Sequence, residues 1–306
     1  MGTSQSSATP SSSGGMLSAL LSYATNACNV FNGNHLLTSP TKKSKVILVT
    51  GASSGLGKDF ALALNAKGHK VYGAARRVDK MEDLVEQGCL VLAMDITNDE
   101  QVEACVKQIL QENDGRLDVL INNAGYGEYG PVETTPISAA RRQFDVNLFG
   151  LAKLTQEVIP AMREQQSGLI INISSMCGKM YLPLGAWYVA TKHAIEGWSD
   201  CLRWELQPFG INVAIIEPGV IQTEFADVTA GPMLERSKGT PYETFSKRSE
   251  VTMSPPSVIT KCVVRAVEAK RPKTRYLEGS MAKPLVFLRT WGGDRFFDAF
   301  WRFVSS

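Results

Sequence analysis

Short apolar runs alternate with helical periodicity along most of the chain. KVILVT, residues 45–50, is a continuous apolar run of the kind that forms a strand buried on both faces. LGKDFALALNAKG, residues 56–68, follows with apolar residues at helical spacing and a terminating glycine. The same succession then repeats. Further strands are expected over 70–75, 90–95, 117–122, 168–174 and 211–218, with helices over 98–113, 136–165 and 187–208.

This alternation predicts an α/β fold built on one doubly wound parallel sheet, with helices on both faces. Parallel strands need crossover connections, and helices are the usual crossovers. From 219 to 256 the periodicity lapses and glycine, proline and charged residues mix, which predicts a long lid or binding loop. A helix is expected again over 257–270 and a short strand over 274–279.

The two ends of the chain depart from the pattern. Residues 1–41 carry no charged side chain and are rich in serine and threonine, so we expect residues 1–43 to be a disordered extension. A transit peptide is the alternative, because the segment has no acidic residue. The tail, residues 281–306, is expected to pack on the domain or on a second subunit; a wall of an apolar substrate pocket or a membrane-surface contact is the alternative. Its aromatic stripe comprises Phe296, Phe297, Phe300, Trp301 and Val304.

Composition excludes several classes of protein. The chain has 306 residues, 44% of them hydrophobic, which is enough for one large core. Lysine and arginine number 32 against 30 acidic residues, so no electrostatic signature of a nucleic-acid partner is present. The six cysteines form no C-x-x-C pair and the three histidines show no ligand spacing. We therefore expect no metal and a cytoplasmic location, with organelle targeting or peripheral membrane association as alternatives.

A glycine-rich loop lies between the first strand and the first helix. In TGASSGLG, residues 50–57, the glycines let the backbone turn sharply and approach a pyrophosphate at the helix N-terminus. A plain turn is the alternative, but the position after a strand and before a helix is the context of a dinucleotide fingerprint. The candidate cofactor ligands in this loop are Gly51, Ser53, Gly55, Leu56 and Gly57.

The second strand ends in GAARRVDK, which bears on the choice of nucleotide. An NAD site usually places an acidic residue here for the ribose 2′-hydroxyl, whereas the 2′-phosphate of NADP needs a cation. Arg76 and Arg77 occupy this region, so we predict NADP in preference to NAD, with Arg76 as the phosphate ligand. Solvated charges at a helix cap are the alternative. Asp95, at the end of the third strand, is a candidate for the adenine.

Polar side chains also end the later strands. NNAG, which contains Asn123, ends the fourth strand, and Ser175 ends the fifth. Tyr188 and Lys192 follow on the next helix, four residues apart and so on one face. Asn147 lies on the helix between these strands. Because all of them map to one edge of one sheet, they indicate an active site rather than separate turns and caps.

Together these motifs resemble the short-chain dehydrogenase/reductase family. The resemblance rests on TGxxxGxG, NNAG, the serine before YxxxK, and a PG followed by a threonine, and it covers roughly residues 45–278. It implies a single Rossmann-like domain over residues 44–280 that binds NAD(P) and catalyses a redox reaction. The head and the aromatic tail lie outside it.

The resemblance and the chemistry of the residues agree on the catalytic roles. A tyrosine with a pKa of about 10 is a poor base at neutral pH, but a neighbouring ammonium favours the phenolate. We therefore expect Tyr188 to be the general acid/base and Lys192 to lower its pKa and, by resemblance, to hold the nicotinamide ribose. Ser175 would hydrogen-bond the substrate oxygen.

Further roles come from the resemblance alone. It implies that Asn147 anchors a water molecule that links Lys192 to solvent, and that Asn123 belongs to the cofactor site. It also implies that the backbone of Val220 and the side chain of Thr223 contact the carboxamide and the phosphates of the cofactor.

Three hypotheses of function follow from the motifs. The first is an NADP-dependent oxidoreductase acting on an alcohol or ketone. The second is a non-catalytic NADP-binding sensor, which ranks behind because such proteins typically lose the tyrosine or lysine. The third, a nucleotide-sugar epimerase or dehydratase, needs more chain after Tyr188 than is present.

The substrate is expected to be apolar, in the manner of a steroid, a retinoid or a lipid-like ketone. Apolar residues flank the catalytic serine and tyrosine and predict an apolar pocket wall, although core packing is the alternative for most of them. The family resemblance also suggests a homodimer or homotetramer. The flanking residues are Met176, Cys177, Met180, Tyr181, Leu182 and Trp187.

Overall fold

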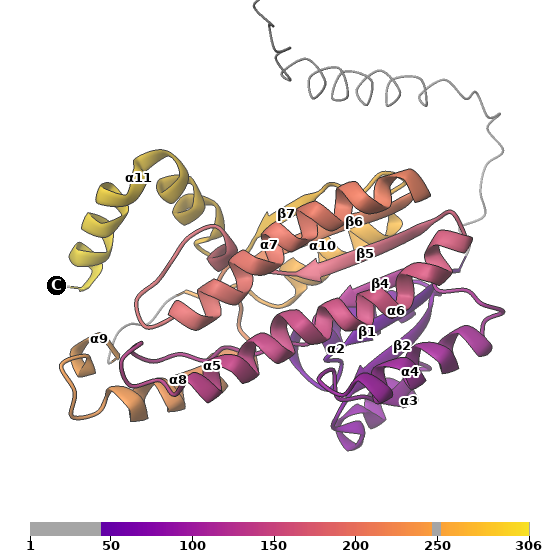
Figure 1. Cartoon of the computed structure of the whole chain (residues 1–306), viewed down its shortest axis with the longest axis horizontal. Coiled ribbons are helices and arrows are strands. Elements are labelled where there is room, and N and C mark those ends of the chain that lie inside the picture. Colours follow the sequence, from indigo (N-terminus) through magenta and orange to yellow (C-terminus); the bar gives the residue numbers. More distant parts are fainter. Residues whose placement is uncertain (1–43, 247–251, 306) are drawn as a thin grey trace, which may run out of the picture. The chain divides into compact units, whose positions relative to one another are not determined.

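A parallel seven-stranded sheet forms the centre of the molecule (Figure 1). The computed structural model describes residues 44–246 and 252–305, so the predicted extension over residues 1–43 lies outside the described residues. The strand order is β3-β2-β1-β4-β5-β6-β7, and every pair of neighbours is parallel. The strands are β1 (Val46–Thr50), β2 (Lys70–Ala75), β3 (Leu90–Ala93), β4 (Val119–Asn122), β5 (Gly168–Ile173), β6 (Ile211–Pro218) and β7 (Arg275–Glu278).

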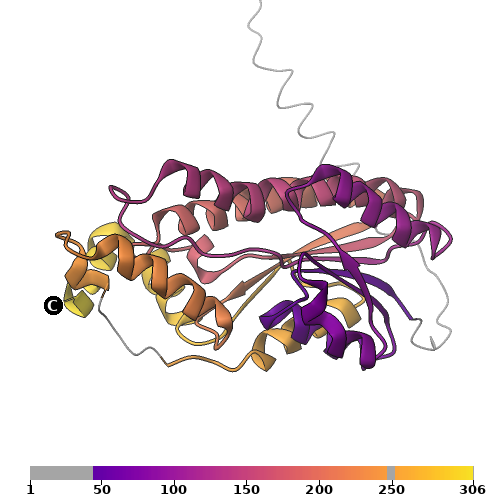
Figure 2. The same cartoon turned by 90° about the horizontal axis from the view of Figure 1, so that it is seen from below.

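Helices cover both faces of this sheet (Figure 2). Continuous apolar strands require this arrangement, because both of their faces must be removed from water. One core lies between the sheet and α2 (Gly55–Asn65), α3 (Glu82–Glu86) and α10 (Ser257–Glu268). The other lies between the sheet and α4 (Asp99–Gln111), α6 (Leu151–Glu164) and α7 (Ala186–Leu206). The predicted doubly wound α/β architecture is therefore confirmed.

The segment from 219 to 256 is not the structureless loop that its sequence suggested. It contains α8 (Glu224–Ser237) and the short α9 (Glu243–Ser246). Gly231 and Pro232 lie inside α8 and weaken its helical propensity, so local sequence does not reveal the helix. Contacts with a distant segment hold α8 in place: Arg236 donates to the carbonyl oxygen of Tyr129 and accepts from the hydroxyl of Thr134.

The C-terminal residues form α11 (Ala282–Ser305), which bends at Gly293 (φ 70°, ψ −179°). Phe297 is fully buried, and Phe300 and Trp301 are half-buried against a cluster that includes Tyr181. Phe296, expected on the same packed stripe, is instead 57% exposed. Adjacent helix positions differ by about a quarter of a turn, so Phe296 points away from the side on which Phe297 is buried.

Candidate active site

The glycine loop turns tightly against the end of β4. Gly51 has a φ of +67°, and a Cβ atom there would lie 2.9 Å from the Cα of Ala124. A Cβ on Gly57 would lie 2.4 Å from the carbonyl oxygen of Gly51 and 2.5 Å from Nδ2 of Asn123. Only glycine fits at these two positions, which leaves the backbone bare for the close approach of a pyrophosphate.

Thr50 and Asn123 lock this loop to the neighbouring strand. Asn123 Nδ2 donates to the Thr50 carbonyl oxygen at 2.9 Å, and the Thr50 hydroxyl accepts from the backbone N–H groups of Asn123 and Ala124 at 3.0 and 2.9 Å. The side chain of Asn123 therefore positions the loop. Thr50 was not among the predicted site residues, although its position at the carboxyl end of β1 could have identified it as one.

The N-terminus of α2 is arranged to receive an anion. Ser54 is the N-cap residue, but its side chain makes no capping hydrogen bond, and the first turn has no acidic residue. Thr223, the N-cap of α8, lies opposite, because a Cβ on Gly55 would lie 3.8 Å from its Cβ. Leu56 is half-buried and packs its side chain into the core, so only its backbone can serve a ligand.

The two arginines after β2 have different partners. Arg77 Nη2 donates to the hydroxyl of Ser53 at 3.3 Å and lies 3.5 Å from that of Ser54. Arg76 is 73% exposed, and its Nη1 lies 4.0 Å from Oδ2 of Asp95. Arg77 therefore contacts the glycine loop directly, while Arg76 stands beside the end of β3. The sequence alone could not separate these neighbouring arginines.

Asp95 is held mainly by its own turn. Its Oδ1 accepts from the Thr97 backbone at 3.0 Å and from the Thr97 hydroxyl at 2.8 Å. Burial opposes ionisation, but the hydrogen bonds from Thr97 and the charge of Arg76 bring the pKa of Asp95 below its usual value. The carboxylate is therefore ionised at neutral pH, and its role at the adenine stays a prediction.

Tyr188, Lys192 and Ser175 come together at the carboxyl ends of β5 and β6, and all three are buried. Lys192 Nζ donates to the carbonyl oxygen of Ile173 at 2.8 Å and lies 5.7 Å from the centre of the Tyr188 ring. The Ser175 hydroxyl accepts from the backbone of Cys177 at 3.1 Å. The spacing of YxxxK on one helix thus places the phenol and the ammonium beside the serine.

Burial sets the protonation of this group. It raises the pKa of Tyr188 above its usual value, and a hydrogen bond with Ser175 only partly opposes the rise. Burial lowers the pKa of Lys192 to about 8, against the attraction of Cys177 and Glu196. At neutral pH the chain by itself therefore presents a protonated phenol beside a mostly charged lysine.

Asn147 lies in a π-helical turn, residues 145–150, between α5 (Ile137–Phe144) and α6. Such turns are frequent at functional sites. Asn147 Nδ2 donates to the Tyr126 carbonyl oxygen at 2.9 Å, and its Oδ1 accepts from the Tyr126 N–H at 3.0 Å. Nδ2 also lies 3.2 Å from the hydroxyl of Thr191, the residue before Lys192. Asn147 thereby ties the loop after β4 to α7.

Two aromatic rings cover the catalytic tyrosine. The ring centres of Tyr129 and Phe225 lie 5.4 and 5.5 Å from that of Tyr188. Arg236, near the end of α8, pairs with Glu128 and donates to the Tyr129 carbonyl oxygen at 3.0 Å. These residues were not predicted. Their signal, aromatics in GYGEYG and TEF, became informative only once α8 was seen to lie over the site.

The backbone of Val220 already has partners within the chain. Its N–H donates to the carbonyl oxygen of Ser280 at 3.0 Å, and its carbonyl oxygen accepts from Ser254 at 2.9 Å. A carboxamide bound at Val220 would therefore have to share or replace these hydrogen bonds. The predicted role of Val220 stays a prediction.

A cluster of four charged side chains adjoins the loop that follows Ser175. Its members are Lys179, Glu196, Glu217 and Arg275. Lys179 and Arg275 contact the buried carboxylate of Glu196 at 2.9 and 3.1 Å, and Arg275 Nε lies 3.3 Å from Glu217. Burial, and next the charge of Glu196, raise the pKa of Glu217 to about 7. The cluster joins the loop after Ser175 to α7, β6 and β7.

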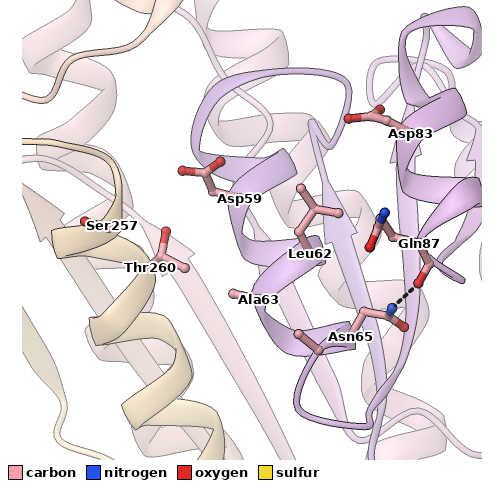
Figure 3. Close-up of a pocket in the computed structure, with 9 residues that line it drawn as sticks. Asp59, Leu62, Ala63, Asn65, Asp83, Gln87, Ser257 and Thr260 are labelled. Atoms are coloured by element: carbon pink, nitrogen blue, oxygen red, sulfur yellow. Dashed lines mark hydrogen bonds between the residues drawn. The ribbon is translucent and has the colours of Figure 1, made fainter.

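A hollow lined by other residues lies outside this site, and Figure 3 shows its lining side chains. It has a volume of about 640 Å³ and lies between α2, α3 and α10. Asp59, Asn65 and Thr260 are among its lining residues, and none of the predicted site residues is. In the part of the chain that the structure describes, no group of three or more histidine, cysteine or acidic side chains is placed to hold a metal ion.

Comparison with known proteins identifies the family. The short chain dehydrogenase family matches residues 45–231. The chain belongs to this family. The uncharacterized oxidoreductase YbbO of Escherichia coli (strain K12) is 35% identical over 232 residues, 76% of this chain and 84% of the relative. A 3-ketodihydrosphingosine reductase of Bacteroides thetaiotaomicron is 42% identical over 183 residues, 60% of this chain and 66% of the relative. The protein is therefore an NAD(P)-dependent dehydrogenase/reductase.

Solved structures of short-chain dehydrogenases share the fold. One from Streptomyces avermitilis has a TM-score of 0.69 at 31% identity, covering 82% of this chain and 97% of that chain. One from Burkholderia cenocepacia J2315, in complex with NADP, has a TM-score of 0.66 at 27% identity, covering 87% and 100%. A 3-ketoacyl-(acyl-carrier-protein) reductase from Brucella melitensis, complexed with NADH, has a TM-score of 0.64 at 27% identity, covering 74% and 91%. The choice between the two nucleotides thus depends on this chain's own residues.

The glycine loop yields a direct test of the cofactor site. In Gly57→Ala the new Cβ would meet the Gly51 carbonyl oxygen at 2.4 Å, so the loop must open and nucleotide affinity should fall about tenfold or more. Gly197→Ala, on α7, is the matched control, because a Cβ there meets nothing within 4 Å. Titration by nucleotide fluorescence measures both. Unchanged binding in Gly57→Ala would contradict the assignment of the loop.

Proposed function

We propose that this short-chain dehydrogenase is an NADP-dependent oxidoreductase acting on the alcohol or ketone group of an apolar, lipid-like substrate. The observation that carries the proposal is the buried Tyr188 phenol beside Lys192 and Ser175, enclosed by aromatic rings. When bound, the nicotinamide ring supplies or accepts the hydride. The residues of the chain provide the proton, the orientation and the exclusion of water.

Tyr188 is the proton donor in the direction of reduction. A ketone oxygen gains negative charge as hydride reaches its carbon, and a protonated phenol at hydrogen-bond distance neutralises that charge. Burial keeps the pKa of Tyr188 high, so the phenol carries its proton at neutral pH. Ser175 hydrogen-bonds the same oxygen, and the Lys192 ammonium stabilises the phenolate that remains. The free enzyme therefore holds the proton that reduction of a ketone requires.

The surroundings of Tyr188 support an apolar substrate. Tyr129 and Phe225 lie against its ring, and Met180 and Leu182 belong to the same apolar cluster. A substrate that reaches the phenol must replace these ring contacts, which apolar carbon does at little cost and a charged group does not. The 3-ketodihydrosphingosine reductase relative agrees with a lipid ketone. Steroids and retinoids fit the same chemistry.

For the cofactor we propose NADP, held by both arginines after β2. Arg77 already contacts Ser53, and the exposed guanidinium of Arg76 lies beside it in sequence at the end of the same strand. A 2′-phosphate gains charge-assisted hydrogen bonds from such a pair. A homodimer or homotetramer and a cytoplasmic location stay predictions.

Removing the phenolic hydroxyl tests the mechanism. Tyr188→Phe should bind nucleotide as the wild type does but lose carbonyl reduction by about 10²-fold or more, because general acid catalysis is lost. Tyr129→Phe, the same change in the neighbouring ring, is the control and should retain most of its rate. Loss of NADPH absorbance with a set of lipid-like ketones measures both. A Tyr188→Phe enzyme that keeps most of its rate would contradict the proposed mechanism. A wild-type protein that binds nucleotide but turns over none of the ketones would favour the hypothesis of a non-catalytic NADP-binding sensor.

The lowered pKa of Lys192 predicts the alkaline side of the pH profile. As pH rises through about 8 the buried amine loses its charge and no longer stabilises the phenolate, so kcat/KM should decline. In Lys192→Arg the guanidinium stays charged, so whatever activity remains should show no decline near that pH. Initial rates of the wild type and of Lys192→Arg, measured across the pH range, test this prediction. A flat alkaline profile in the wild type would contradict the role of Lys192.

The arginines predict nucleotide selectivity. Arg76→Ala and Arg77→Ala should each weaken NADPH binding about tenfold or more, since a hydrogen bond to a charged group contributes about 1.5–3 kcal/mol, and should leave NADH nearly unchanged. Arg271→Ala, an exposed arginine elsewhere, is the control. Fluorescence titration with both nucleotides measures the effect. Equal losses for NADPH and NADH would mean that the arginines do not read the 2′-phosphate.

A further inference from the structure

Exposed aromatic side chains are concentrated on α11. Among the described residues six phenylalanine and tryptophan side chains are exposed, and four of them lie on this one helix. Phe287, Trp291, Phe296 and Phe303 are 65%, 77%, 57% and 82% exposed. Single exposed apolar side chains are ordinary, but a group of this kind marks an interaction surface.

The bend at Gly293 gives α11 two arms (Figure 1). Each arm carries two of the four exposed side chains. Phe287 and Trp291 are four residues apart on the first arm, and their ring centres lie 6.4 Å apart. Phe296 and Phe303 are seven residues apart on the second arm and so lie on one face. We call these four residues the aromatic face of α11.

The charge around this face is positive. Residues 282–305 contain four lysine and arginine side chains against two aspartates. Lys283 pairs with Glu278 and Arg289 with Asp294, and the other aspartate, Asp298, accepts a hydrogen bond from Tyr181. Over residues 44–246 and 252–305, neither Arg295 nor Arg302 has a carboxylate partner within 4.0 Å, and both adjoin the aromatic face in sequence. Each of them is exposed.

We propose that the aromatic face of α11 binds the surface of an anionic phospholipid membrane. Phenylalanine and tryptophan rings partition into the boundary between headgroups and acyl chains, and arginine binds lipid phosphate. The proposed contact is peripheral. Among the residues that the structure describes, no helix is long and apolar enough to cross a bilayer. Exposed rings with arginines beside them in sequence are typical of a helix that lies in that plane.

A second copy of the chain fits this face less well. A twofold dimer packs the same patch of both copies together, so the excess positive charge of one copy would face that of the other. Like charges in a desolvated interface oppose association. An anionic lipid surface compensates the positive charges of Arg295 and Arg302. Because of this charge complementarity we prefer a membrane to a second copy of the chain as the partner of this face.

The same helix connects this surface to the catalytic residues. On its inner side Leu285 and Phe297 belong to the apolar cluster that contains Met180 and Tyr188. Binding to lipid does not depend on catalysis. A further consequence is that a ketone dissolved in the lipid can reach the site from the membrane. This consequence alone rests on the proposed function.

Vesicle flotation of the full chain tests the proposal. Wild-type protein should float with vesicles of phosphatidylcholine and phosphatidylglycerol in equal amounts, and float less with phosphatidylcholine alone or at high salt. Phe287→Ser combined with Trp291→Ser should lower the partition coefficient about tenfold or more. Arg295→Glu combined with Arg302→Glu should remove the preference for the anionic lipid.

Control variants distinguish a specific effect of α11 from a general effect of removing exposed aromatic side chains. Phe149→Ser combined with Trp204→Ser changes exposed aromatics elsewhere, 59% and 68% exposed, and should leave flotation unchanged. Circular dichroism verifies that each variant is folded. The proposal is overturned if the wild type does not float, if the α11 variants float like the control, or if light scattering shows that Phe287→Ser with Trp291→Ser dissociates an oligomer. Because flotation needs no substrate, failure of the proposed function would leave its result unaffected.

Discussion

Parallel pairing of the seven strands is the constraint on which the site depends. Because neighbouring strands run in the same direction, the loops that follow them gather at one edge of the sheet. The glycine loop after β1, Asn123 after β4 and Ser175 after β5 thus meet although they are far apart in sequence. The order β3-β2-β1-β4 reverses the direction of the crossovers at β1, and ligands bind at such a reversal.

Burial sets the protonation states of the catalytic residues that the sheet brings together. An ammonium taken out of water is destabilised, which lowers the pKa of Lys192, and the carbonyl oxygen of Ile173 partly compensates. The same burial keeps the Tyr188 phenol protonated. The rings of Tyr129 and Phe225 lie against the phenol ring and contribute to its burial. The position of α8 is therefore as much a part of the site as the catalytic residues.

Errors in the sequence-based expectations share one cause. The loop expected from 219 to 256 contains α8, because Gly231 and Pro232 obscure its helical pattern and contacts such as that of Arg236 with Tyr129 hold it. Phe296 was placed on a packed stripe, yet it faces outward while Phe297 faces inward. In both cases the deciding contacts come from segments remote in the chain, which a local pattern does not contain.

The sequence by itself determined the strands, most of the helices, the glycine loop and the shared helical face of Tyr188 and Lys192. These depend on apolar periodicity and on short-range backbone geometry, which neighbouring residues specify. Only the tertiary structure decided that Arg77 contacts the glycine loop while Arg76 stands by Asp95, that aromatic rings cover Tyr188, and that α11 turns four aromatic side chains outward. Burial and electrostatics depend on which distant segments pack together, and that information exists only in the folded chain.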